Sequence, residues 1–214
     1  IDEGWVDKIT ELEQERVPAG SPEGGQFGPG GGGGEFTNEE LRGTRVEVAK
    51  INDVKERTRV NEALNTWVDS DGYSAINGAL RAADPMAWAY GDEQQTIRAL
   101  DRSFASLGVN TPREVTVYRA VGDLGFELKP GVTFVDRGFT ATTADLGVAR
   151  TIAREMVVDR AGKTQVGTLL HVQLKKGERI LNLAGLNDEI LLARAGTYRV
   201  VSTATTHVNV EKLI

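Results

Sequence analysis

The stretch "EVTVYRAV", residues 114–121, marks the point at which the hydrophobic pattern of the chain changes. Before it, apolar residues recur at the spacing of amphipathic helices. After it come short runs rich in Val, Thr, Ile and aromatic residues, a pattern typical of β-strands. Because a doubly wound α/β sheet would alternate the two kinds of element, helices followed by strands favour an α+β fold with largely antiparallel sheets.

Upstream of residue 114 the pattern predicts helices as far as Gly108. Thr37, followed three residues later by Glu40, has the spacing of a capping box and predicts a helix start. Residues 44–68 are mostly polar with a sparse apolar face, and "GYSAINGALRAAD" predicts a short helix. Residues 92–107 carry one apolar stripe and complete the helical part.

Downstream, one helix is expected among the strands, over "ADLGVARTIAREMVVD", residues 144–159, with Leu146, Ala149, Ile152 and Met156 on one face. The runs that predict strands are 114–121, 132–143, 166–174, 178–183, 189–193, 197–206 and 207–213.

The first 36 residues differ from the rest. Residues 1–17 could form a short helix, and residues 18–34 contain nine Gly and three Pro, so 18–36 is predicted to be a flexible linker. The glycine run lacks the Lys-Ser/Thr of a phosphate-binding loop. The catalytic or binding domain is therefore expected over residues 37–214.

Composition excludes several kinds of site. The 25 basic and 31 acidic residues give a net charge of −6, which makes nucleic acid an unlikely partner. The absence of cysteine excludes disulfides and thiolate chemistry. His171 and His207 lack metal-site spacing, so no metal is expected. No apolar run approaches the roughly 20 residues needed to cross a bilayer, so no membrane partner is expected.

Several polar residues stand at expected strand ends. If the strand alternates, Arg119 shares a face with two valines, and it needs either an anionic partner at a cleft or exposure at a sheet edge. Thr140, Thr142 and Thr143 precede a helix and could cap it, or could bond an acid and a ligand. The sequence leaves both alternatives open for Arg119 and both alternatives open for the three threonines.

Four segments, taken in order, resemble the mono-ADP-ribosyltransferase toxins of the Arg–Ser–Glu class, in particular the clostridial binary toxins and the Rho-modifying exoenzymes. The segments are "LNTWVDSDGYSAINGALR" (64–81), "DRSFASLGVNTPREVTVYRA" (101–120), "DRGFTATTAD" (136–145) and "NDEILLARAGTYRV" (187–200). The resemblance implies N-terminal helices packed on two facing, largely antiparallel sheets around an NAD cleft.

The resemblance also implies an activity and its residues. Such enzymes cleave the nicotinamide–ribose bond of NAD and pass ADP-ribose to an acceptor through an oxocarbenium-like transition state. Glu189 matches the carboxylate that stabilises this state, and Arg119 matches the arginine that supports the NAD phosphates. The further matching NAD-binding positions are Arg81, Asn77, Phe139, Thr142 and Thr143.

The sequence departs from the family pattern at two places. Ala141 stands where a serine holds the catalytic acid, so Thr143 or Thr140 would have to substitute. Asn187 stands where arginine-modifying members carry a glutamate; an amide can orient an acceptor but cannot act as a base. In an extended strand Asp188 faces away from Glu189. The sequence therefore predicts transfer to a host protein and leaves the acceptor residue open.

Two other functions compete with this one. A glycohydrolase of the same fold would pass ADP-ribose to water, and a non-catalytic phage domain would only bind or assemble. The linker segment "VPAGSPEGGQFG", residues 17–28, is similar to segments of actinobacterial phage head proteins. Localisation is unknown: action in a host or target-cell cytoplasm, in a virion, or after secretion within a longer chain all remain open.

Overall fold

The computed structural model describes residues 34–69, 72–82, 92–122, 124, 126–160, 163–183, 189–204 and 206–213. The predicted segment 1–17 and residues 18–33 of the predicted linker lie outside the described residues, as do Asn187 and Asp188. Among the described helices, none combines the length and the apolar character needed to cross a membrane.

The helical half contains α2 (Asn38–Gly43), the 3₁₀ helix η1 (Val48–Lys50), α3 (Val54–Val68), α4 (Gly72–Arg81) and α6 (Asp92–Leu107). The predicted capping box is confirmed, since Thr37 and Glu40 each accept a hydrogen bond from the other's main chain. The α-helix expected within 44–68 begins only at Val54, because Asp53 is its N-cap and accepts from the Glu56 amide at 2.8 Å.

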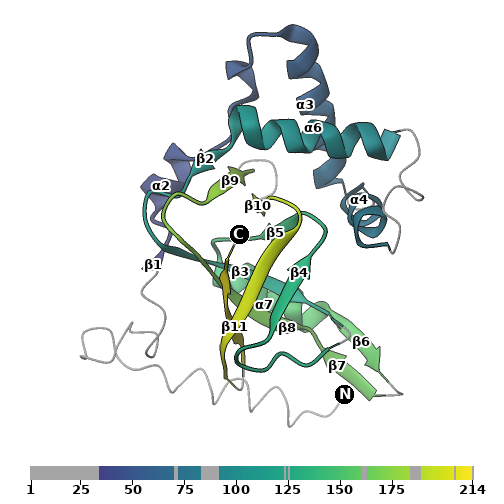
Figure 1. Ribbon diagram of the computed structural model, residues 1–214, viewed down its shortest axis with the longest axis vertical. Helices are drawn as coiled ribbons and strands as arrows, with labels where there is room; N and C mark the ends of the chain where they lie inside the picture. Colours follow the sequence, from purple (N-terminus) through teal and green to yellow (C-terminus); the bar gives the residue numbers. More distant parts are fainter. Residues whose placement is uncertain are drawn as a thin grey trace. The chain divides into compact units, whose positions relative to one another are not determined.

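Two larger sheets and a hairpin form the rest (Figure 1). The six-stranded sheet has the order β1 (Gly34–Glu35), β3 (Val115–Val121), β8 (Thr168–Leu174), β12 (Val208–Lys212), β11 (Gly196–Thr203), β4 (Thr133–Asp136). The four-stranded sheet has the order β2 (Val109–Asn110), β9 (Arg179–Asn182), β10 (Ile190–Leu192), β5 (Thr140–Thr142). β6 (Val157–Arg160) and β7 (Lys163–Val166) form the hairpin. The β1–β3 and β12–β8 pairs are parallel, and the other pairs are antiparallel.

The two larger sheets face each other across one apolar core, which takes Val117 and Leu170 from the six-stranded sheet and Ile190 and Leu192 from the four-stranded sheet. A second core lies on the other side of the four-stranded sheet, where α3, α4 and α6 gather (Figure 1). The predicted α+β class with two facing, largely antiparallel sheets is thus confirmed.

The stretch 132–143, predicted as one strand, is two strands in different sheets. β4 ends at Asp136 in the six-stranded sheet, and β5 starts at Thr140 in the four-stranded sheet. Gly138 lies between them, where a Cβ atom would overlap the carboxamide of Asn77. This crossing carries the chain from one sheet to the other beside α4.

The ends of two other predicted segments also differ. Gly34 and Glu35 pair with β3, and Phe36 is only 8% exposed, so the folded unit starts before residue 37. The helix α7 (Leu146–Glu155) ends before β6, and Ile152 is 43% exposed although its side was predicted to be buried. Ala149, which belongs to the predicted face, is buried together with Ala153, and these two small residues allow close packing on β3.

Candidate active site

Asp136, at the end of β4, bonds two arginines that come from different elements. Arg81, the last residue of α4, donates from Nε to Oδ1 at 2.9 Å and from Nη2 to Oδ2 at 3.0 Å. Arg119 on β3 donates from Nη1 to Oδ2 at 2.8 Å, and its side chain is 17% exposed. The two predicted phosphate-binding arginines are therefore brought together by a carboxylate.

The electrostatics of this cluster favour an ionised Asp136. Burial opposes ionisation, but the hydrogen bonds from Arg81 and the charge of Arg119 outweigh it and lower the pKa of the Asp136 carboxyl. The Gly138 amide and the Thr140 hydroxyl also donate to it, at 3.1 and 3.3 Å. Two cations and one anion leave a net positive charge, which suits an anionic ligand.

Glu189 lies immediately before β10 and is partly buried. The indole Nε1–H of Trp67, on α3, donates to its Oε1 at 2.7 Å. Burial raises the pKa of Glu189, while the hydrogen bond from Trp67 and the charge of Arg119 act to lower it. Glu189 and Arg119 thus share one electrostatic environment.

Two hydrogen bonds link the side-chain amide of Asn77, on α4, to the main chain of Phe139, the residue just before β5. Asn77 Nδ2 donates to the Phe139 carbonyl at 3.1 Å, and the Phe139 amide donates to Asn77 Oδ1 at 2.9 Å. The Phe139 ring has no exposed surface; it stacks on Phe104 and meets the Trp67 ring edge-on at 5.7 Å. In this structure Asn77 and Phe139 support the site from the core.

The three predicted threonines have separate partners. Thr140 donates to Asp136 and accepts from the Tyr198 hydroxyl at 3.0 Å. Thr142 donates to the Ile190 carbonyl at 2.6 Å, which ties β5 to the strand that follows Glu189. Thr143 accepts from the main-chain amide of Asp145 at 3.0 Å, at the start of α7.

The structure gives Glu189 a different partner from the one expected. Thr143 or Thr140 was expected to replace the serine missing at Ala141, but their hydroxyls bond the residues just described. Trp67 donates to Glu189 instead. Asn187, expected beside Glu189, lies outside the described residues.

Asp136 and Trp67 are the residues that sequence reasoning did not identify. Both lie inside segments that carry the family resemblance. An anionic partner was one of the two alternatives for Arg119, and an acid at a strand end, two residues before a glycine, was the signal that could have indicated Asp136. A tryptophan at a helix end gives no comparable signal, because most such residues only pack in a core.

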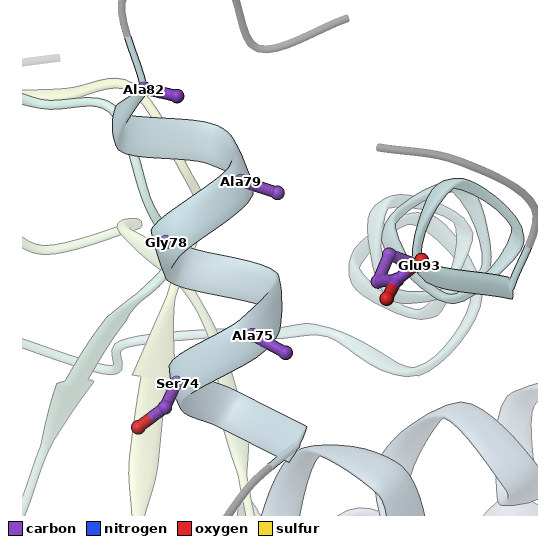
Figure 2. A pocket seen from close by; sticks show the side chains of 6 residues that line it. All are labelled: Ser74, Ala75, Gly78, Ala79, Ala82 and Glu93. Carbon is purple, nitrogen blue, oxygen red and sulfur yellow. The ribbon is translucent and has the colours of Figure 1, made fainter. Parts of the chain in front are cut away.

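A pocket of about 390 Å³ opens on the opposite side of α4, lined by Ser74, Ala75, Gly78, Ala79, Ala82 and Glu93 (Figure 2). The three alanines point towards α6 (Figure 2). Asn77 and Arg81 instead bond Phe139, just before β5, and Asp136 on β4. The pocket therefore lies apart from the arginines and Glu189. Among the described residues, no three His, Asp or Glu side chains are grouped as metal ligands would be.

Comparisons with known proteins bear on the family and the fold of this chain. Residues 47–214 match the family model described as ADP-ribosyltransferase exoenzyme. That range excludes the linker, so the resemblance of residues 17–28 to phage proteins remains a prediction. No curated protein matches the sequence.

Solved structures show the same fold at low sequence identity. The C3 exoenzyme of Clostridium limosum is 16% identical, with 84% of this chain and 97% of that chain covered and a TM-score of 0.62. The Vis toxin of Vibrio splendidus is 22% identical, with 84% and 88% covered and a TM-score of 0.59. C3stau2 from S. aureus, solved with NAD, is 18% identical, with 83% and 96% covered and a TM-score of 0.55. Since the family model spans most of the chain, this protein belongs to the ADP-ribosyltransferase exoenzyme family.

Proposed function

We propose that this protein cleaves the nicotinamide–ribose bond of NAD and transfers ADP-ribose to a side chain of a target protein, with Glu189 as the catalytic carboxylate. The observation that carries the proposal is the position of Glu189. It is partly buried, hydrogen-bonded by Trp67, and within the electrostatic influence of Arg119. That arrangement suits a reaction in which positive charge develops on a sugar ring.

The arginine cluster supports binding of the NAD diphosphate. Arg81 and Arg119 carry two positive charges, and Asp136 carries one negative charge. Guanidinium groups bind phosphate oxygens through paired donors. A related structure, C3stau2, was solved with NAD. NAD is therefore the co-substrate that the cluster is proposed to hold.

The proposed chemistry follows from these charges. The bond between ribose C1′ and the nicotinamide nitrogen breaks, and its electron pair leaves with nicotinamide, which becomes neutral. The Glu189 carboxylate stabilises the positive charge on the ribosyl group. An acceptor nucleophile then bonds to C1′ and releases its proton to water. No step in this scheme needs a metal.

The acceptor is left open between residue types. Asn187 precedes Glu189 by two positions, and its amide can hydrogen-bond an acceptor but cannot remove a proton from it. An asparagine or another side chain that needs no strong base therefore fits as well as arginine. The acceptor is proposed to belong to a protein of a host or target cell.

The test uses labelled NAD, a cell lysate as the source of acceptor, and the variants Glu189→Gln and Glu62→Gln. The amide keeps the shape of Glu189 and removes its charge, so transfer should fall by about a hundredfold or more while NAD binding persists. Glu62 is an exposed residue of α3 and serves as the control, with transfer like the wild type. Equal transfer by wild type and Glu189→Gln would show that Glu189 is not the catalytic carboxylate.

The same assay separates the two competing functions. A glycohydrolase would release nicotinamide without labelling protein, which the absence of a base at Asn187 favours. A non-catalytic domain would release none, and NAD would leave its melting temperature unchanged, whereas tight NAD binding would raise it by mass action.

A further inference from the structure

Trp67, the hydrogen-bond partner of Glu189, is almost fully buried, at 1% exposure. Its ring packs edge-on against Phe139 at 5.7 Å and against Tyr73 at 6.4 Å, so the surrounding core fixes its orientation. The indole N–H is a donor that requires a partner once buried. That partner is Glu189, 122 residues further along the chain.

The strand register shows why the donor comes from a helix. Ala141 on β5 pairs with Leu191 on β10, and Glu189 lies two residues before Leu191. Ala141 therefore stands on the same face as Glu189, one diagonal step away. Its methyl group offers no hydrogen bond.

The neighbouring hydroxyls on β5 point to the other face. Thr140 and Thr142 alternate with Ala141, and their hydroxyls donate to Asp136 and to the Ile190 carbonyl. Within the described part of the chain, the side-chain hydrogen bond made to the Glu189 carboxylate comes from Trp67.

We propose that Trp67 is a positioning residue for the transfer reaction: its N–H holds the Glu189 carboxylate in place on the face where Ala141 supplies no donor. The proposal rests on the proposed function, because it assigns a role through Glu189. Trp67 itself touches neither NAD nor acceptor in this role. The Trp67 ring also packs on Phe139, whose main chain is hydrogen-bonded by Asn77, so these three residues hold one another in place.

The hydrogen bond also acts on the ionisation of Glu189. Burial raises the pKa of this carboxyl, and the Trp67 N–H and the charge of Arg119 on β3 counteract that effect. Removing the N–H should raise the pKa further. The fraction of ionised Glu189 at a given acidic pH would then fall.

The main variant is Trp67→Phe, which keeps an aromatic ring and removes the donor. We expect kcat for NAD cleavage to fall about tenfold to a hundredfold, the worth of a hydrogen bond to a charged group, with KM for NAD little changed. The acidic limb of the kcat profile should move to higher pH. A purely structural role for Trp67 would lower the melting temperature without moving this limb.

Two further variants guard against simple misfolding. Replacing Trp67 by benzothienylalanine exchanges the N–H for sulfur at nearly constant size, so lost activity in a protein of wild-type melting temperature would implicate the donor. Adding Ala141→Ser to Trp67→Phe places a hydroxyl on the face of Glu189. This double variant should recover part of kcat and return the acidic limb towards its wild-type position.

A readout without activity separates this inference from the proposed function. The indole proton of Trp67, assigned by its loss in Trp67→Phe, should shift in NMR spectra as Glu189 titrates, and Glu189→Gln should abolish that titration. Unchanged kcat and pH profile in Trp67→Phe, or an indole signal that Glu189→Gln does not affect, would overturn the inference even if the wild type is active. If the wild type is inactive but its indole signal still titrates, the proposed function and the catalytic role of Trp67 are both overturned. Only the hydrogen bond between Trp67 and Glu189 would then stand.

Discussion

Arg119 and Asp136 form an ion pair of 2.8 Å between a central strand and an edge strand of the six-stranded sheet. Arg81 forms a second ion pair with the same carboxylate, from Nε to Oδ1 at 2.9 Å. Because Asp136 is the common partner, it fixes the orientation of both guanidinium groups, which we propose bind the NAD diphosphate.

Replacing Asp136 by Asn should disturb both arginines at once. We expect kcat/KM for NAD to fall about tenfold or more through loss of orientation. The free energy of unfolding should fall by about 2–3 kcal/mol, since Arg119 loses its partner in a largely buried position. Steady-state kinetics and denaturant melts measure the two effects.

Asp101→Asn provides the matched control. Asp101 makes a similar two-pronged pair with Arg194, but both side chains are far more exposed than Asp136. Its loss should cost less than about 1 kcal/mol and leave kinetics unchanged. If the two variants behave alike, Asp136 has no special role in placing the arginines.

The acid dependence of stability should also depend on Asp136. Its pKa is lowered from 3.8 in the folded state, so its contribution is present above that value and is lost as the pH falls through the folded pKa. Asp136→Asn should therefore flatten the stability curve below about pH 4. Melts at several pH values check this, and an unchanged slope would contradict it.

Asn77→Ala removes both hydrogen bonds to the Phe139 main chain. A buried amide and a buried carbonyl lose their partners together, so we expect a loss of about 2–4 kcal/mol in the free energy of unfolding. Asn61→Ala, at an exposed position of α3, should change it by less than about 0.5 kcal/mol. Activity per folded molecule should also fall in Asn77→Ala, because Phe139 supports Trp67.

Thr142 holds the main chain next to Glu189, the proposed catalytic carboxylate, through its 2.6 Å hydrogen bond to the Ile190 carbonyl. Thr142→Val has nearly the same shape without the donor and should lower stability by about 1–2 kcal/mol and reduce kcat. Thr142→Ser keeps the hydroxyl and should retain activity close to the wild type. Comparable kinetics for the Val and Ser variants would mean that the hydroxyl does not hold the strand.

His171 gives a separate pH dependence. Burial, together with the charges of His207 and Arg150, lowers its pKa from 6.5 to about 3. Between these two pH values the unfolded chain binds a proton at His171 and the folded protein does not. The free energy of unfolding should therefore fall by up to about 1.4 kcal/mol per pH unit as the pH drops. His171→Phe should reduce this slope and leave the part that comes from His207, whose pKa is also lowered by burial, and melts between pH 7 and 4 would reveal the difference.

The sequence by itself determined the class of fold and the family. Hydrophobic periodicity distinguished helices from strands, and the capping box located the start of α2 correctly, because both signals depend on neighbouring residues only. The order of motifs led to the family that the comparisons confirm. Local patterns put Arg119 on one face with two valines but left open whether it would meet an anion or lie exposed at a sheet edge.

Only the tertiary structure decided which residues meet. Local patterning could not show that the run 132–143 divides between two sheets, because the division depends on Gly138 packing against Asn77 of a distant helix. Nor could it show that Trp67 would donate a hydrogen bond to Glu189, since 122 residues separate the two. Contacts of that range are fixed by the packing of helices on sheets, which no single segment encodes.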